Sequence, residues 1–330
     1  ILAEQCPGDV LRGHQGGMNG ARRAGDTAAE SAGQKVIAFV LRAALRATVK
    51  RAFQAGLPVG QQRRRLLSAT RLTLPPRSVS FETAGSAGVP GEMVRQRGRE
   101  AATPVILYLH GGGYTTGSPR THRALTGHLA VRCGARLFVP DYRLAPEHPF
   151  PAGLDDAVMA YRGLLSDGIV PGDIVIAGDS AGGGLAVAAA LRLRELGLPL
   201  PRALVLFSPL ADLAREYPDV PPCGEVMLTP AWLRECARAY VAAGDPRDPL
   251  ISPVAADLRG LPPTLIQVGT DELLLPDSRR LFERLQSAGV RTELREFPGR
   301  WHVFQASAGV LADADRALDE VARFIRTSPH

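Results

Sequence analysis

Short apolar runs alternate with amphipathic segments over most of the chain. The runs have the length and composition of buried strands and cover residues 105–109, 137–140, 174–177, 204–207, 265–268 and 292–297. Stretches with helical periodicity lie between them, near residues 121–132, 154–165, 181–196, 277–288 and 311–325. Nearly continuous apolar strands interleaved with helices predict an α/β fold with a mostly parallel central sheet flanked by helices on both faces.

The N-terminal region has a different pattern. In residues 34–55, apolar side chains recur near helical spacing, at Val36, Phe39, Val40, Ala43, Ala47 and Phe53, while the basic residues Lys35, Arg42, Arg46 and Lys50 point elsewhere. We expect an amphipathic helix whose apolar face packs on the rest of the protein, with a membrane-surface helix as the alternative. A second short helix is expected over 61–69.

Two further stretches interrupt the alternation. Residues 79–83 and 92–97 read as paired strands separated by a glycine-rich turn. Residues 210–253 are long, rich in proline and contain a helix near 230–241, so we expect an insertion between two strands.

These patterns predict the domain organisation. Residues 1–17 are polar and glycine-rich and precede Met18, so we treat them as a disordered or non-native leader. Residues 18–75 hold the N-terminal helices. Residues 76–330 form the main α/β domain, with the insertion at about 210–253.

Composition narrows the class of protein. The chain has 330 residues, 45% of them hydrophobic, which suits one large enzyme domain. Its formal charge is +6, yet 39 Lys and Arg are scattered among 33 Asp and Glu, and only Arg63, Arg64 and Arg65 form a tight run. Because no basic stripe is interleaved with aromatic residues, we expect no nucleic-acid partner.

The cysteines and the apolar runs indicate the cellular compartment of the protein. The four cysteines, Cys6, Cys133, Cys223 and Cys236, form neither a CxxC pair nor a disulfide or zinc pattern, so we expect free thiols in a reducing compartment. No secretory signal is recognisable, and the best apolar run, 36–45, is interrupted by Arg42 and is shorter than the ~20 residues of a membrane span. We therefore expect a soluble, cytoplasmic protein.

The strongest chemical motif is Gly178-Asp179-Ser180-Ala181-Gly182, which follows the apolar run 174–177 and opens a helix rich in Ala and Leu. Glycines on both sides of the serine allow a sharp turn that exposes the hydroxyl, which is the pattern of a nucleophile elbow. The alternative is a glycine-rich turn whose serine only caps the helix.

A second motif, His110-Gly111-Gly112-Gly113-Tyr114, follows the run 105–109. Consecutive glycines let backbone N–H groups approach a substrate oxygen and stabilise negative charge on it. A phosphate-binding loop is disfavoured, because the sequence has neither a GxxxxGK[ST] nor a GxGxxG motif.

Together the two motifs resemble the hormone-sensitive-lipase-like esterases, or bacterial esterase family IV, of the α/β-hydrolase superfamily. A third motif of that family is present as Asp141-Tyr142-Arg143-Leu144-Ala145-Pro146-Glu147. The resemblance extends from about residue 78 to the C-terminus. It implies a serine carboxylesterase acting on small esters with short or medium acyl chains, and it implies that the N-terminal helices and the insertion form a cap over the active site.

A catalytic triad in this fold places its acid and then its histidine after the serine. His302 follows the run 292–297, whereas the only other histidine beyond Ser180 is the terminal His330. Asp271 follows the run 265–268 directly and is our predicted acid, with Glu272 and Asp277 as alternatives. We thus predict Ser180 as nucleophile, His302 as base and Asp271 as the residue that orients it.

The remaining predicted site residues surround this triad. We expect the N–H groups of Gly111, Gly112 and Ala181 to form the oxyanion hole, and Tyr114 and Asp179 to border the substrate pocket, where Asp179 fixes the elbow by hydrogen bonding. The resemblance implies that Asp141 and Arg143 brace the oxyanion loop.

We predict no cofactor and no metal, because no ligand spacing such as HExxH occurs. The same machinery acting on lactones, acetylated drug-like alcohols or amides stays open, as does a non-catalytic relative that binds a small ligand. Dimerisation through an edge strand is frequent in the resembling family, and no residue here demonstrates a homodimer.

Overall fold

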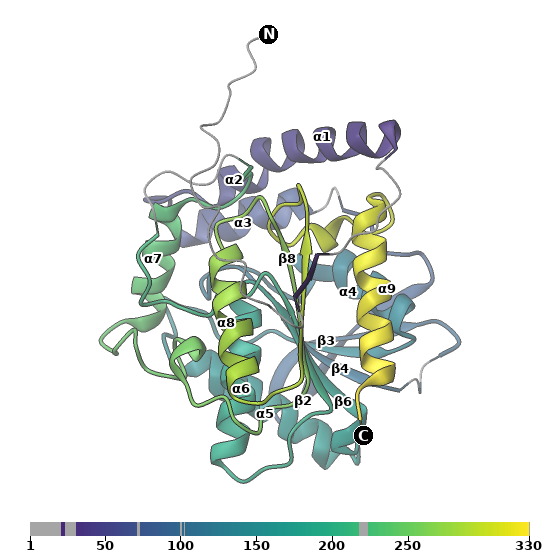
Figure 1. Ribbon diagram of the computed structural model, residues 1–330, viewed down its shortest axis with the longest axis vertical. Helices are drawn as coiled ribbons and strands as arrows, with labels where there is room; N and C mark the ends of the chain where they lie inside the picture. Colours follow the sequence, from purple (N-terminus) through teal and green to yellow (C-terminus); the bar gives the residue numbers. More distant parts are fainter. Residues whose placement is uncertain are drawn as a thin grey trace.

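The computed structural model describes residues 21–23, 31–70, 73–99, 101, 103–217 and 224–329. The predicted leader, residues 1–17, lies outside the described residues. Seen in Figure 1, the strands run up the middle of the molecule, with helices around them and helix α1 across one end.

A nine-stranded sheet forms the centre, in the order β1-β9-β8-β7-β6-β4-β5-β3-β2. The strands are β1 (Ala21–Arg23), β2 (Val79–Ser86), β3 (Val89–Gln96), β4 (Val105–Leu109), β5 (Arg136–Pro140), β6 (Ile174–Asp179), β7 (Ala203–Phe207), β8 (Thr264–Gly269) and β9 (Thr292–Phe297). Strands β2 and β3 pair antiparallel, as do β3 and β5, and every other neighbouring pair is parallel. The predicted α/β fold with its mostly parallel sheet is confirmed, because the apolar runs form the strands.

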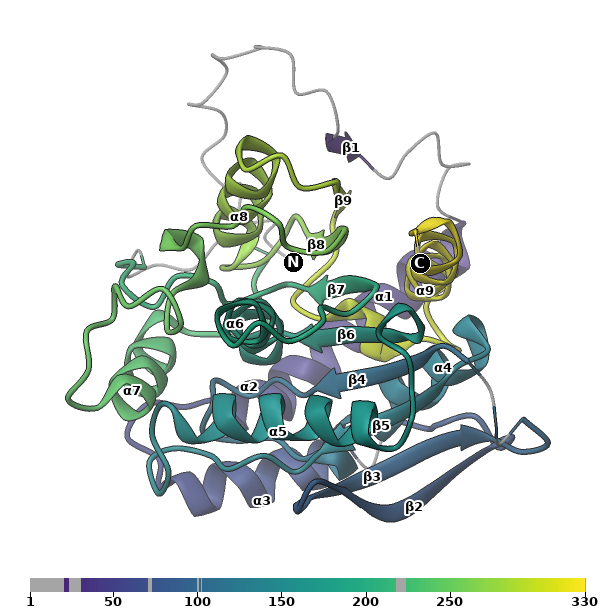
Figure 2. The same cartoon turned by 90° about the horizontal axis from the view of Figure 1, so that it is seen from below.

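Helices cover both faces of this sheet. The helices of the main domain are α4 (Arg123–Cys133), α5 (Ala152–Ser166), α6 (Ala181–Glu195), α8 (Leu275–Ser287) and α9 (Ala312–Thr327). Figure 2 shows α4 and α9 on one face and α5, α6 and α8 on the other. Strands β4, β6 and β7 are buried along their whole length, which explains why they lack a polar alternation.

The N-terminal helices and one helix of the predicted insertion lie outside these layers. They are α1 (Ala32–Ala47), α2 (Val49–Ala52), α3 (Val59–Thr70) and α7 (Pro230–Val241). The single helix expected over 34–55 is divided at Thr48, whose backbone is the C-cap of α1 and the N-cap of α2. The helices expected over 61–69 and near 230–241 are confirmed as α3 and α7. The domain boundaries drawn from the sequence stay a prediction.

Helix α1 does not present the face that its pattern predicted. Val36, Phe39 and Val40 are exposed, whereas Ala38 is buried and Leu41 is half-buried. The expected burial of the first three side chains is therefore wrong. The helix has apolar residues on two sides, and the side bearing Ala38 and Leu41 meets the protein. Across the described ranges, no helix is long and apolar enough to cross a membrane.

Candidate active site

Ser180 lies in the sharp turn between β6 and α6. Its backbone has φ 54° and ψ −121°, a region that a residue with a side chain adopts only when its surroundings impose it. The turn is held because the Ser180 N–H donates to the Phe207 carbonyl at 2.8 Å and its own carbonyl accepts from the Leu210 N–H at 2.8 Å. A Cβ on Gly182 would collide with the Leu109 carbonyl oxygen, so only glycine permits this approach. The geometry is that of the predicted nucleophile elbow.

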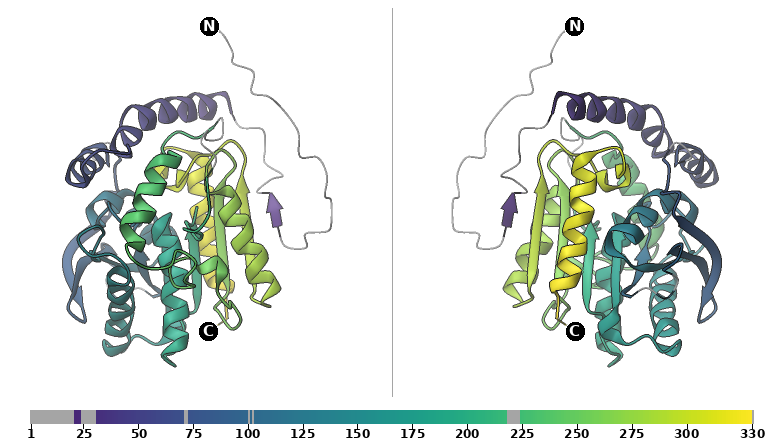
Figure 3. Two further views of the ribbon diagram at one scale, coloured as in Figure 1. Left: turned by 90° about the vertical axis from the view of Figure 1, so that its left-hand side faces the viewer. Right: turned by 90° about the vertical axis from the view of Figure 1, so that its right-hand side faces the viewer.

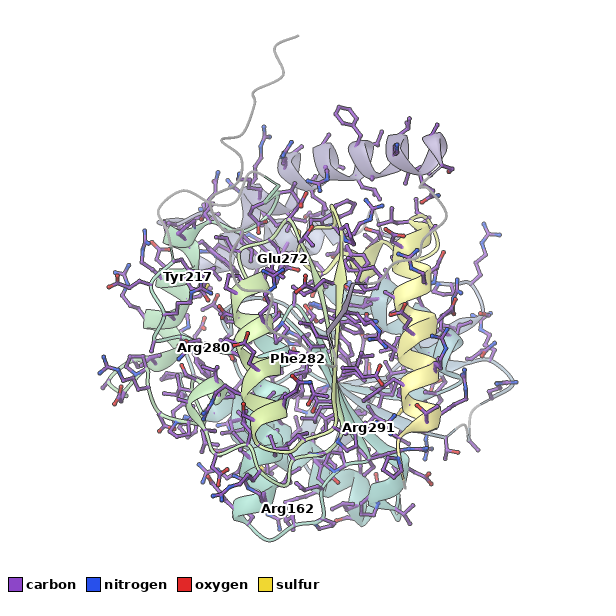
Figure 4. All side chains as sticks on the ribbon, viewed as in Figure 1. Arg162, Tyr217, Glu272, Arg280, Phe282 and Arg291 are labelled. Carbon is purple, nitrogen blue, oxygen red and sulfur yellow. The ribbon has the colours of Figure 1, made fainter. Side chains whose placement is uncertain are left out.

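His302 follows β9 and is hydrogen-bonded to a buried carboxylate. Its Nδ1 lies 2.7 Å from Oε2 of Glu272, and both side chains are almost completely buried. The other oxygen of Glu272, Oε1, accepts from the Gly269 N–H at 2.7 Å and from the Ser208 hydroxyl at 2.8 Å. The carboxylate is thus fixed by partners on two strand ends, and in Figure 4 it lies at the end of the sheet nearest α1.

Asp271 does not contact His302, so the prediction that it orients the imidazole is wrong. Its Oδ2 instead accepts from Nη2 of Arg42 at 2.6 Å, and its side chain is 31% exposed. Adjacent residues in the turn after β8 point in different directions, and it is Glu272 that points into the core toward His302. Asp277, the other alternative, bonds Arg215 from within α8.

The pKa of His302 follows from this environment. Burial lowers this pKa, but the hydrogen bond that Glu272 accepts from Nδ1 and the negative charge of Glu272 outweigh burial, so the pKa is raised above the ordinary value of 6.5. The bond at Nδ1 also leaves Nε2 as the nitrogen available to a nucleophile. A carboxylate that both fixes the ring and stabilises its protonated form is the arrangement of a serine-hydrolase triad.

The glycine loop after β4 differs in one position from the expectation. The Gly111 N–H donates to Oδ1 of Asp179 at 3.1 Å, so this group is occupied and the prediction that it belongs to the oxyanion hole is wrong. Gly112 has φ 122° and borders the cavity at Ser180. Ala181 is the first residue of α6, where an N–H has no acceptor within its helix. Gly112 and Ala181 remain candidate donors.

A buried polar network lies behind the elbow. Asp179 accepts from the Tyr108 hydroxyl at 2.7 Å and from Gly111, and its Oδ2 lies 3.4 Å from Nε2 of His122. Burial raises the pKa of Asp179, but the His122 charge and these hydrogen bonds outweigh it and hold the pKa below its ordinary value. The expectation that Asp179 fixes the elbow is consistent with these contacts. Tyr108 and His122 were missed, because nothing in the local sequence indicates that they meet Asp179.

The segment after β5 braces the glycine loop through a different residue than expected. The Tyr142 hydroxyl donates to the His110 carbonyl at 2.6 Å, and the two rings stack with centroids 4.3 Å apart. Arg143 instead pairs with Asp156 of α5, and Asp141 is exposed. The prediction that Asp141 and Arg143 brace the oxyanion loop is therefore wrong, and Tyr142 performs this structural role.

Ser180 and His302 both border an apolar cavity of about 200 Å³. The cavity lies between the carboxyl ends of the strands and the outer helices. Its walls come from the N-terminal helices, the predicted insertion and the histidine loop, and they include Leu41, Leu45, Phe53, Leu66, Met227, Leu228, Trp232, Trp301 and Val303. Asp179 also borders the cavity, as expected.

Tyr114 is not among the residues that line the cavity, so its predicted place in the pocket wall is wrong. It has φ 61°, and its ring stacks on Tyr240 of α7 with centroids 3.8 Å apart. The ring thereby anchors α7 to the glycine loop. Gly184 makes room for it, because a Cβ there would lie 2.7 Å from the Tyr114 hydroxyl.

Comparison with known proteins agrees with this geometry. A family model described as the alpha/beta hydrolase fold matches residues 106–306. The chain is 43% identical over 270 residues to an acetyl-hydrolase of Streptomyces hygroscopicus, covering 77% of this chain and 90% of that protein. It is 37% identical to an esterase of Acinetobacter venetianus, covering 85% of this chain and 93% of that protein.

Solved structures agree as well. A crystal structure of an esterase from the bacterial hormone-sensitive lipase family matches with a TM-score of 0.80 and 36% identity, over 91% of this chain and 99% of that one. The hormone-sensitive-lipase homologue EstE7 from a metagenome library matches with a TM-score of 0.79 and 40% identity, over 88% of this chain and 97% of that one. The chain therefore belongs to the α/β-hydrolase fold family, among the bacterial esterases similar to hormone-sensitive lipase, and is a carboxylic-ester hydrolase.

Proposed function

We propose that Ser180, His302 and Glu272 form a catalytic triad that hydrolyses esters of small acyl groups, acetyl esters above all, through an acyl-enzyme. The observation that carries the proposal is the buried bond of His302 to Glu272, facing the same cavity as the strained Ser180. The cavity of about 200 Å³ suits a short acyl chain. Relatives named as acetyl-hydrolases support this substrate class.

In the first half of the reaction, the Ser180 oxygen attacks the ester carbonyl carbon while Nε2 of His302 takes the hydroxyl proton. Glu272 stabilises the imidazolium that forms. Negative charge develops on the carbonyl oxygen, where the N–H groups of Gly112 and Ala181 would donate to it. The imidazolium then returns the proton to the departing alcohol, and the acyl group stays on Ser180.

In the second half, His302 takes a proton from a water molecule, whose oxygen attacks the acyl carbon. The intermediate collapses, the carboxylic acid leaves, and the proton returns to Ser180. The apolar residues over the cavity exclude other water and strengthen each electrostatic contact within it.

Two measurements test the proposal. A fluorophosphonate probe should label the wild-type chain and should not label a Ser180→Ala variant. A series of p-nitrophenyl esters should show kcat/KM highest for acetyl to butyryl and falling steeply with longer chains. Labelling at a residue other than Ser180 would contradict the triad. A preference for long chains, lactones, aryl amides or acetylated drug-like alcohols would contradict only the substrate class.

We also propose a cytoplasmic location. Cys133 and Cys236 are free in the structure, which a reducing compartment favours. Fractionation of cells that express the native gene would test this, and recovery from the extracellular medium would contradict it.

A further inference from the structure

Three large apolar side chains of helix α1 point away from the protein. Val36 is 62% exposed, Phe39 73% and Val40 57%. Residues spaced three and four apart lie on one side of a helix, so the three form a single patch rather than scattered exposures. Ala43 and Ala47 are also exposed and extend the same side. We call this the outer face of α1.

The outer face of α1 lies at one end of the molecule. Figure 1 and Figure 3 show α1 as the outermost helix, lying across the end of the sheet. The opposite side of α1 already has its partners, because Ala38 is buried in the core and Leu41 and Leu45 pack against it. Packing within the fold therefore accounts for the inner side of α1 but not for the apolar side chains of the outer face.

The charge of this region is one-sided. Residues 31–70, which hold α1, α2 and α3, contain eight basic residues and no Asp or Glu. The whole chain has a formal charge of +6, so the remainder of the chain has +6 − 8 = −2. The excess positive charge of the protein is thus concentrated on the helices over the active site.

Some of these basic residues form ion pairs within the protein, and others are exposed. Arg42 pairs with Asp271 and Arg63 with Glu147. The exposed basic residues of the three helices are Lys35, Arg46, Arg51, Arg64 and Arg65. Lys35 and Arg46 lie on α1 itself, beside Phe39, because positions 35, 39 and 46 share one side of the helix at 100° per residue.

We propose that the outer face of α1 docks on the surface of an anionic phospholipid bilayer. Val36, Phe39 and Val40 would enter the interface between headgroups and acyl chains, and Lys35 and Arg46 would contact the phosphate headgroups. An apolar strip bordered by cations is the composition of interfacial helices. A second copy of the chain fits less well, because two basic faces would meet and repel each other.

This docking would place the membrane directly above the active-site cavity. The same helix has one side on the bilayer and the other on the cavity, through Leu41 and Leu45. An ester that partitions into the membrane surface would therefore reach the cavity after a short path. The docking proposal stands independently of the catalytic one, because it depends on residues that do not contact the substrate cavity.

The test is co-sedimentation of the full chain with vesicles. We expect the wild-type protein to pellet with vesicles of phosphatidylcholine and phosphatidylglycerol in equal parts, at about 0.05 M NaCl. Binding should fall about tenfold or more with pure phosphatidylcholine vesicles, or with anionic vesicles at about 0.5 M NaCl, where charges are screened within a few ångströms. Absence of wild-type binding to the anionic vesicles at low salt would overturn the proposal.

Two double variants and a matched control test whether the outer face of α1 is the surface that binds vesicles. The pair Phe39→Asp with Val40→Asp should lose binding about tenfold or more, and the pair Lys35→Glu with Arg46→Glu should lose most of it. Leu196→Asp is the control, because Leu196 is 53% exposed and follows the last residue of α6, at the end away from Ser180. It should bind like the wild type. Equal binding by the Phe39 and Val40 double variant would overturn the proposal.

Two further readouts distinguish lipid binding from misfolding and from self-association. All variants should hydrolyse dissolved p-nitrophenyl acetate at the wild-type rate, since no altered side chain lines the cavity, and this shows that they fold. Light scattering after size exclusion reports self-association. A wild-type dimer that the Phe39 and Val40 variant converts to a monomer, with no vesicle binding by either, would assign the outer face to a second copy and overturn the lipid assignment.

Discussion

Glu272→Gln and Asp271→Asn form a matched pair that separates the two adjacent candidates for the catalytic acid. Each change replaces a carboxylate by an amide of the same shape. In the structure only Glu272 contacts His302, through Oε2 and Nδ1 at 2.7 Å. Asp271 is instead bonded to Arg42. The two variants are therefore expected to differ greatly in activity although they are neighbours in the chain.

The magnitude follows from the partners of Glu272. Its Oε1 accepts from the Gly269 N–H, which can only donate, so the glutamine must place its oxygen on that side. The amide NH₂ then faces Nδ1 of His302 and donates to it. This moves the ring proton to Nε2, and His302 can no longer take the Ser180 proton. Stabilising the wrong tautomer in this way costs about 10³- to 10⁴-fold in kcat, or about 4–5.5 kcal/mol of barrier.

Asp271→Asn should reduce kcat far less than Glu272→Gln. The change removes the charge opposite Arg42, and the pair is partly exposed, with side chains 18% and 31% accessible. Ion pairs of this kind contribute about 1 kcal/mol or less. We expect kcat within about threefold of wild type, since the bond from His302 to Glu272 is intact.

The assay is steady-state hydrolysis of p-nitrophenyl acetate at a pH above the His302 pKa. Circular dichroism and the melting temperature of each variant serve as the control for folding. The reasoning is refuted if Asp271→Asn loses as much kcat as Glu272→Gln, or if Glu272→Gln keeps more than about a tenth of the wild-type kcat.

Three further predictions follow from the contacts around the site. The pKa of His302 is raised above 6.5, so the neutral imidazole is lost as the pH falls through that pKa. A pH-rate profile should therefore show kcat/KM declining toward acid with an apparent pKa above 6.5. An apparent pKa below about 6 for this decline would contradict the prediction. Arg42→Ala removes the bonds that tie α1 to Asp271 and to the carbonyls of Gly224 and Gly299. We expect KM to rise about tenfold or less, with a smaller change in kcat, and Tm to fall by a few degrees; a KM like that of wild type would contradict this. Asp179→Asn weakens the bonds to Tyr108 and Gly111 that fix the glycine loop, so kcat should fall about 10-fold or more, and a variant as active as wild type would show that the loop holds without this carboxylate.

Much of this protein was determined by its local sequence. Apolar runs of strand length and helical periodicity between them specify the parallel sheet, because burial on two faces requires that pattern wherever it occurs. Ser180 was identified because the turn that exposes it needs glycines at fixed offsets. His302 was identified by the order of the triad and by its place after β9. These features depend on a few neighbouring residues, so the sequence displays them directly.

Other features were decided only by tertiary structure. Asp271 and Glu272 are equivalent in the sequence, and the carboxylate that meets His302 is that of Glu272, because Gly269 and Ser208 hold it in that position. The sequence does not distinguish Gly111 from the glycines beside it, yet in the structure its N–H donates to Asp179, at the end of β6.

Which side of helix α1 is exposed was likewise decided by tertiary structure. Its periodicity shows apolar positions on two sides, and only the location of the cavity decides that Leu41 is covered while Phe39 is exposed. In each case at least one deciding contact joins residues far apart in the chain, and the direction of a side chain in a loop is fixed by what packs against it rather than by its own sequence.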